Sequence, residues 1–376
     1  MKILKHVIIL IILLLQAGCI VEFVPNISEE KELIVVEGLL TDQGDSTIIK
    51  LSVSLPLGQK SEARPLTGCT VALSDDMGSN LVLDEVLPGT YVSHFHGYVG
   101  RTYTLHIKTG QSRNNFSYES YPVRMKPAPP IDSVYWEKRI IRVPVDVIPG
   151  IDECQIYLDT HSPDNSCRYY RWDYTETWKL RLPFDIPNYI CWMTNTSKNI
   201  YIQSTAALNE DRIKHYPVTY ISNATDRLKT RYSIIVNQYS LNEDEYYYWE
   251  KLKKLTEQAG GLYDIIPSSI PSNIFCVNDP GEKVLGYFSV SAKSSSRIYI
   301  QEKFAGIIDP YAKCASDTLL NGPDYIEGLG ETIWTLFDTP GSWTSPRIRI
   351  FTIIRGCADC TVRGSKVKPD FWTDGK

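Results

Sequence analysis

Short runs of strand-forming residues, spaced evenly through the first third of the chain, limit most strongly how this sequence can fold. Two runs rich in valine and isoleucine, 33–40 and 47–54, flank a polar turn at 41–46, which predicts a β-hairpin. Later runs in the same region are 69–73, 80–83, 89–93 and 100–107. About seven such strands over 33–126 predict a β-sandwich of the immunoglobulin-like or transthyretin-like type.

A proline-rich segment interrupts this pattern. Pro127, Pro129 and Pro130 fit the interior of neither a strand nor a helix, so we expect a domain boundary there. The remainder, 131–376, is expected to form a larger β-rich domain of the sandwich type.

The most aromatic strand of this second domain is expected at 168–178. Successive side chains of a strand point to opposite faces of the sheet. One face therefore carries Tyr170, Trp172 and Tyr174, and the opposite face carries Tyr169, Arg171 and Asp173. We expect one of these faces to pack and the other to be polar.

One strong amphipathic helix is expected at about 241–259. Ser240 and Glu243 have the spacing of a capping box, and Gly260 with Gly261 predicts the end of the helix. Its apolar side chains fall on one stripe, so we expect it to cover a sheet, with an interaction helix as the alternative. The predicted fold class is therefore mainly β with a single amphipathic helix.

The first residues of the chain predict where it resides. Lys2 and Lys5 precede an uncharged run that ends at Leu15, and two small residues then lead into Cys19. The run is shorter than the roughly 20 apolar residues that a membrane-spanning helix needs. It is typical of a lipoprotein signal peptide, here 1–18, after which Cys19 carries acyl chains that anchor the protein to a lipid bilayer. An ordinary secretory signal is the alternative.

Residues 19–32 are polar and without periodicity, as in a flexible tether.

The charge of the chain narrows the range of partners. The chain has 39 basic and 44 acidic residues and no basic cluster, so nucleic acid is not an expected partner.

Cysteine usage agrees with export into an oxidising compartment. Apart from Cys19 the chain has an even set of cysteines, namely Cys69, Cys154, Cys167, Cys191, Cys276, Cys314, Cys357 and Cys360. Cys357 and Cys360 are the one tight pair, and we expect a structural disulfide, either within the pair or from one member to a distant cysteine. No second CxxC and no HxxxH motif supplies further zinc ligands, so neither a metal nor a cofactor is expected.

Aromatic residues are frequent, with 24 Tyr and 8 Trp, and such residues are enriched where proteins bind partners. We single out Tyr170, Trp172, Trp178 and Trp343 as candidate ligand or partner contacts, with a place in the core as the alternative for each. Recurring catalytic motifs of serine hydrolases, metalloproteases, P-loop proteins and dinucleotide-binding proteins are absent from the sequence. We therefore do not expect an enzyme, although a glycosidase needs only two carboxylates.

Several motifs spread over the expected mature chain carry a family resemblance. They are Ile131-Asp132-Ser133-Val134, Tyr170-Arg171-Trp172, Glu176-Thr177-Trp178, Arg231-Tyr232-Ser233, Tyr248-Trp249, Gly260-Gly261-Leu262-Tyr263-Asp264, Leu285-Gly286-Tyr287-Phe288, Cys357-x-x-Cys360 and Lys368-Pro369-Asp370-Phe371-Trp372. In these motifs the chain resembles the domain of unknown function 4249 family. The resemblance implies an outer-membrane lipoprotein of Bacteroidota encoded beside a TonB-dependent receptor, and it implies no catalytic residue.

Together these features predict a non-enzymatic lipoprotein, anchored by lipid on the periplasmic or cell-surface face of the outer membrane. It is expected to act as a partner or substrate-capturing accessory subunit of a TonB-dependent transporter. The alternatives are an adhesin or envelope-scaffold module and, third, a carbohydrate-active enzyme.

Overall fold

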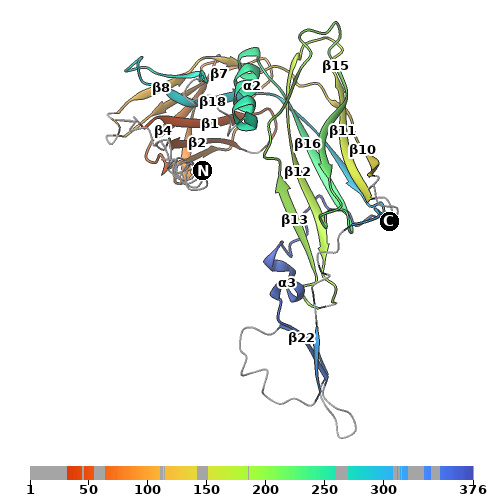
Figure 1. Cartoon of the computed structure of the whole chain (residues 1–376). Coiled ribbons are helices and arrows are strands. Elements are labelled where there is room, and N and C mark those ends of the chain that lie inside the picture. The colour runs from red at the N-terminus through yellow and green to blue at the C-terminus, as the bar shows by residue number, and fades with distance from the viewer. Residues whose placement is uncertain are drawn as a thin grey trace, which may run out of the picture.

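The computed structural model describes most of the chain, namely residues 32–44, 46–54, 64–110, 113, 115–141, 151–184, 186–258, 270–307, 311, 314, 316–320, 334–339 and 348–375. The expected signal peptide 1–18, Cys19, residues 20–31 of the expected tether, and Trp343 lie outside these ranges. The described part is mainly β, as predicted, and contains two β-sandwiches with a helix between them (Figure 1).

The first sandwich has two layers. One layer contains β1 (Ile34–Leu40), β2 (Thr47–Val53), β3 (Arg64–Pro65), β6 (Thr90–Ser93) and β18 (Val284–Val290). The other contains β4 (Thr70–Asp75), β7 (Thr102–Lys108), β8 (Ser117–Ser120), β9 (Val123–Arg124) and β17 (Ile274–Cys276). Strand β5 (Asn80–Leu87) joins the layers, because its first half pairs with β4 and its second half with β6.

The predicted hairpin at the start of the chain is confirmed. Strands β1 and β2 pair in antiparallel register from Ile34 opposite Val53 to Leu39 opposite Ile48. In β2 every second side chain is buried, which is the period of a strand with one face in the core. The hydrophobic core of this sandwich draws on both layers, so the two sheets stabilise each other.

The first sandwich is not formed by residues 33–126 alone, which corrects the expected domain range. Strand β18 lies parallel to β1, from Val284 beside Ile34 to Val290 beside Leu40, and β17 pairs with β8. Gly286 makes this pairing possible, because its φ is +89° and a Cβ there would collide with the carbonyl oxygen of Val36. Local sequence patterns do not show that two such distant segments share a sheet.

The second sandwich follows the proline-rich segment. One layer contains β10 (Ile131–Ile141), β11 (Ile151–His161) and β15 (Arg212–Ile221). The other contains β12 (Tyr169–Arg181), β13 (Ile190–Thr196), β14 (Tyr201–Ser204), β16 (Tyr232–Ser240) and β19 (Lys293–Ile300). The predicted alternation in β12 is confirmed at its buried face, where Tyr170 and Trp172 are at most 1% exposed.

Helix α2 (Glu243–Gln258) stands between the sandwiches (Figure 1) and contacts β12 of the second and β18 of the first. The predicted helix is confirmed, but the predicted capping box is wrong. Ser240 is the last residue of β16, and the first helical hydrogen bond runs from the Tyr246 amide to the Asn242 carbonyl. No helix among the described residues is long and apolar enough to cross a bilayer.

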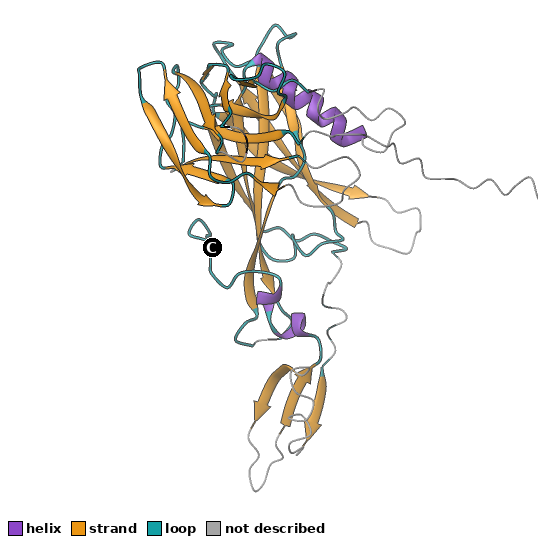
Figure 2. Cartoon of the chain, turned by 90° about the vertical axis from the view of Figure 1, so that its left-hand side faces the viewer, coloured by secondary structure: helices purple, strands orange, loops and turns teal. Residues whose placement is uncertain are grey.

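A narrow extension projects from the second sandwich and ends in a small sheet (Figure 2). The sheet contains β20 (Asp317–Leu320), β21 (Trp334–Thr339) and β22 (Ile348–Thr352). The short helices α3 (Arg355–Ala358) and η4 (Cys360–Val362) follow it and return the chain to β13.

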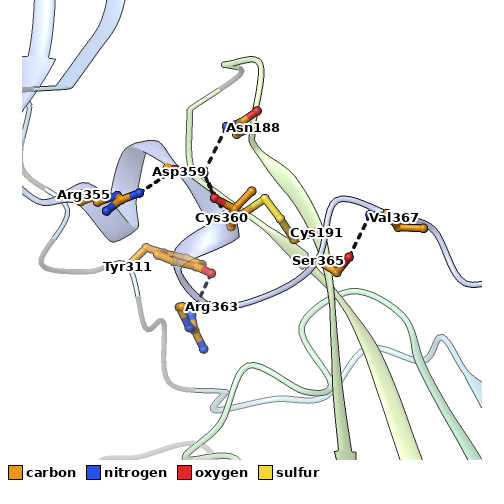
Figure 3. Close-up of a disulfide and its surroundings, with 10 residues drawn as sticks. Asn188, Cys191, Tyr311, Arg355, Asp359, Cys360, Arg363, Ser365 and Val367 are labelled. Atoms are coloured by element: carbon orange, nitrogen blue, oxygen red, sulfur yellow. Dashed lines mark hydrogen bonds and ion pairs between the residues drawn. A yellow bond between two sulfur atoms is a disulfide. The ribbon is translucent and has the colours of Figure 1, made fainter. Parts of the chain in front are cut away.

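Two disulfides stabilise the base of this extension. Cys360 bonds to Cys191 of β13, with the Cα atoms 5.7 Å apart (Figure 3). Cys357 bonds to Cys314. Each member of the tight pair is thus joined to a distant cysteine, and there is no bond within the pair. The remaining described cysteines, Cys69, Cys154, Cys167 and Cys276, are free thiols.

Candidate functional site in the cleft between the first sandwich and helix α2

A cavity lies where the first sandwich, helix α2 and the second sandwich meet. Its volume is about 490 Å³, within the range typical of small-molecule sites. The first sandwich contributes Val36, Glu37, Gly38, Leu39, Ile48, Lys50, Tyr287 and Ser289, helix α2 contributes Tyr248, Trp249 and Leu252, and the second sandwich contributes Arg171. We call this cavity the cleft.

A second, more polar cavity of about 730 Å³ adjoins the cleft. Tyr248 and Tyr287 line both cavities, and their ring centroids are 4.7 Å apart, so this aromatic pair forms the partition. The second cavity also has Arg124, Asp244 and Lys251 in its wall. The helix therefore contacts the first sandwich through aromatic rings and leaves a hollow on each side of them.

Arg171 is the most unusual residue of the cleft. It lies on the β12 face that is turned toward α2, opposite Tyr239 in the neighbouring strand. The carbon of its guanidinium group is 4.6 Å from the ring centroid of Tyr239 and 4.6 Å from that of Trp249, so the cation lies between two aromatic rings. Among the described residues the guanidinium has no hydrogen-bond acceptor and no ion pair, and its Nε is buried without a partner.

Glu245 lies close to this arginine but is completely buried. The indole nitrogen of Trp249 donates to its Oε1 at 3.3 Å, and the Ser291 hydroxyl donates to its Oε2 at 3.4 Å. Burial raises the pKa of Glu245, and the hydrogen bond from Ser289 and the charge of Arg171 offset this only in part. Of the three acidic residues that open α2, Glu243 and Asp244 are exposed and only Glu245 is buried.

The Glu245→Gln variant is expected to be more stable than the wild-type protein at neutral pH, by on the order of 1 kcal/mol. Because the folded-state pKa of Glu245 is raised, the folded protein binds this proton more tightly than the unfolded chain does. The stability that protonated Glu245 adds to the folded protein is therefore fully present at a pH below the pKa of Glu245 in the unfolded chain. It is lost as the pH rises through the pKa of Glu245 in the folded protein. Urea unfolding between pH 4.5 and 8 measures this, and the advantage of the variant should grow with pH.

The matched control for this experiment is Glu257→Gln, which removes an exposed carboxylate from the same helix. Its effect should be within about 0.5 kcal/mol at every pH, as is usual for exposed charged residues. A Glu245→Gln variant that loses stability as pH rises, in parallel with the wild-type protein, would contradict the raised pKa.

The aromatic residues singled out from the sequence are not in the cleft. Tyr170, Trp172 and Trp178 are buried in the core of the second sandwich, where the Trp172 indole donates to Gln238 at 2.9 Å. These three side chains are core residues and not ligand contacts, because strand alternation turns them inward. Trp343, the fourth candidate, lies outside the described residues.

Sequence reasoning missed Arg171 and Trp249 as site residues. The alternation of β12 placed Arg171 on the face opposite Tyr170 and Trp172, and Trp249 lies within the predicted helix, but neither pattern indicates that the two side chains meet. Within the part of the chain that the structure describes, no group of three or more His, Cys, Asp or Glu side chains is arranged to hold a metal ion.

Comparison with known proteins places the chain in a family. No curated protein matches it. The family model described as a domain of unknown function, DUF4249, matches residues 20–297, which span the first sandwich, most of the second, and helix α2. The matched range includes every residue that lines the cleft. The chain therefore belongs to the domain of unknown function 4249 family.

Proposed function

We propose that this protein is a non-enzymatic lipoprotein of the outer membrane that captures a small ligand for a TonB-dependent transporter. The observation that carries the proposal is the cleft, in which apolar and aromatic side chains surround a single unpartnered guanidinium. Such a cavity, mainly apolar with a few polar groups, is typical of ligand-binding sites. The cleft is formed jointly by both sandwiches and α2, so a bound ligand would contact the two sandwiches as well as the helix.

The sequence supports the location. The apolar run before Cys19 has the pattern of a lipoprotein signal, and two or more acyl chains are enough for stable membrane attachment. The polar residues 19–32 would give the first sandwich some reach from the lipid surface.

Affinity purification from mildly solubilised outer membranes tests the proposal. With a C-terminal tag on the full chain, a TonB-dependent receptor should co-purify with the wild-type protein. A clickable fatty acid should label the wild-type protein but not the Cys19→Ala variant. That variant should be lost from the membrane fraction and should no longer co-purify with the receptor. Recovery of no receptor, together with unchanged nutrient uptake in a deletion strain, would refute the transporter role.

A second candidate function, an adhesin or envelope-scaffold module, draws on the projecting extension. The extension exposes the apolar side chains of Phe337, Ile353 and Ile354, which are 51%, 73% and 41% exposed. Exposed apolar surface can mark a protein interaction site. Binding to a host or matrix protein that persists in a strain without the transporter would favour this function over the first.

A further inference from the structure

We propose that the cleft binds a small monocarboxylate with an apolar body, whose carboxylate pairs with Arg171. This inference rests on the proposed function as a ligand-capturing protein, and it adds the chemical class of the ligand.

The first step of the argument is the state of Arg171. A guanidinium has five N–H donors in a planar fork, and a partly buried one is normally paired with a carboxylate, phosphate or carbonyl oxygen. Here the described residues offer it only the faces of Tyr239 and Trp249, whose π systems stabilise the cation but accept no conventional hydrogen bond. Because Nε is buried, the donors available to a ligand in the cleft are those of the two Nη atoms.

The second step is rigidity. Arg171 is fixed on β12, in the middle of a sheet between β14 and β16. Two rings hold its planar group from the sides, and Trp249 is itself fixed by the hydrogen bond from its indole to Glu245. A guanidinium held in this way loses little conformational entropy on binding, which favours a bidentate contact with a carboxylate.

The third step is charge. The charged residues that line the cleft are Arg171, Lys50 and Glu37, and the last two lie opposite each other on β1 and β2. No ion pair between Glu37 and Lys50 is formed, but their charges cancel at a distance, which leaves Arg171 as the one uncompensated charge of the cleft lining. Glu245, which is completely buried near Arg171, does not line the cleft. One net positive charge matches a singly charged carboxylate better than a doubly charged phosphate monoester.

The fourth step is the body of the ligand. Away from Arg171 the cleft is walled by Val36, Leu39, Ile48 and Leu252 and by the ring of Tyr248. Burying the hydrocarbon part of a ligand against this surface stabilises the complex by roughly 25 cal/mol for each Å² of apolar area. A volume of about 490 Å³ accommodates an N-acylated amino acid or a molecule of similar size.

A panel of paired probes tests the proposal on the full mature chain. The panel contains N-acetyl-valine, N-acetyl-leucine and N-acetyl-phenylalanine, each as the free acid and as the amide, and binding is measured by saturation-transfer NMR. At least one acid is expected to bind about ten- to hundredfold more tightly than its amide, because only the acid offers a charge-assisted hydrogen bond. The Arg171→Gln variant should bind acid and amide equally weakly.

Arg297→Gln is the matched control. Arg297 also stacks on an aromatic ring, with its guanidinium carbon 3.6 Å from the centroid of Phe371, but it does not line the cleft. This variant should bind the acids as the wild-type protein does. Circular dichroism and the unfolding midpoint establish that both variants are folded, and Arg171→Lys should retain part of the preference for the acid because it keeps the charge.

The outcomes separate this inference from the transporter proposal. If no acid is preferred over its amide at 10 mM, or if Arg171→Gln leaves the preference unchanged, the carboxylate inference is overturned even where a receptor co-purifies. If the acids bind through Arg171 but no receptor is recovered and a deletion strain takes up nutrients normally, the ligand class stands and the transporter role is refuted.

Discussion

Replacing Arg227 by methionine is expected to lower the free energy of unfolding by about 3–5 kcal/mol. Arg227 Nη1 donates to both carboxylate oxygens of Glu176, at 3.1 and 3.0 Å, and the Tyr232 hydroxyl donates to the same carboxylate at 2.8 Å. Glu176 is only 4% exposed, so removing the arginine leaves a buried carboxylate without its counter-charge. Guanidinium chloride unfolding followed by tryptophan fluorescence measures the loss.

Two further variants sharpen this prediction. Lys254→Met removes a solvent-exposed ion pair to Glu250 on α2 and should cost less than about 0.5 kcal/mol. Combining Arg227→Met with Glu176→Leu should recover most of the stability, because the buried carboxylate is then gone. Equal losses for Arg227→Met and Lys254→Met would show that the Glu176–Arg227 pair is not buried as described.

Removing the Cys191–Cys360 disulfide is expected to lower the free energy of unfolding by about 2–5 kcal/mol. This bond joins β13 to η4 across a sequence separation of 169 residues, so its loss frees a long loop in the unfolded chain. The Cys314–Cys357 bond spans only 43 residues, and its removal should cost roughly 1 kcal/mol less by the chain-entropy account. Serine replacements at both members of each bond, compared by chemical denaturation, give the two values.

Mass spectrometry of peptides prepared without reduction identifies the bonds directly. A crosslink between Cys357 and Cys360, or no change in stability on removing Cys191, would contradict the pairing. Cys154→Ser is a suitable control, since Cys154 is a buried free thiol that takes part in neither bond.

Elements that depend on local pattern could be predicted from the sequence. The hairpin of β1 and β2, the proline-rich boundary and helix α2 each follow from residues that are neighbours in the chain, because alternation and helical periodicity act over a few residues. The inward orientation of Tyr170 and Trp172 follows from the same alternation in β12.

Contacts between distant segments could not be predicted in the same way. The disulfide pairing is one of 105 pairings that eight cysteines allow, and spacing alone favours none of them. The burial of Glu245 depends on Ser291 and on the packing of α2 against β18, which local sequence patterns do not show.

The cleft itself is of this second kind. Arg171, Trp249 and Ile48 come from three separate parts of the chain, and only the completed fold brings them around one cavity. The sequence indicated which face of a strand or helix each residue occupies, but not which surface that face meets.

The parallel pairing of β1 with β18 also limits how early the first sandwich can be completed during folding. The strand Ile34–Leu40 lies near the start of the chain, yet it lacks its neighbour until Val284–Val290 is in place. Until then the folding chain presents an unpaired sheet edge, which is prone to associate with other strands. Completion of the N-terminal module is therefore expected late, and a fragment that stops at the proline-rich segment should aggregate instead of folding.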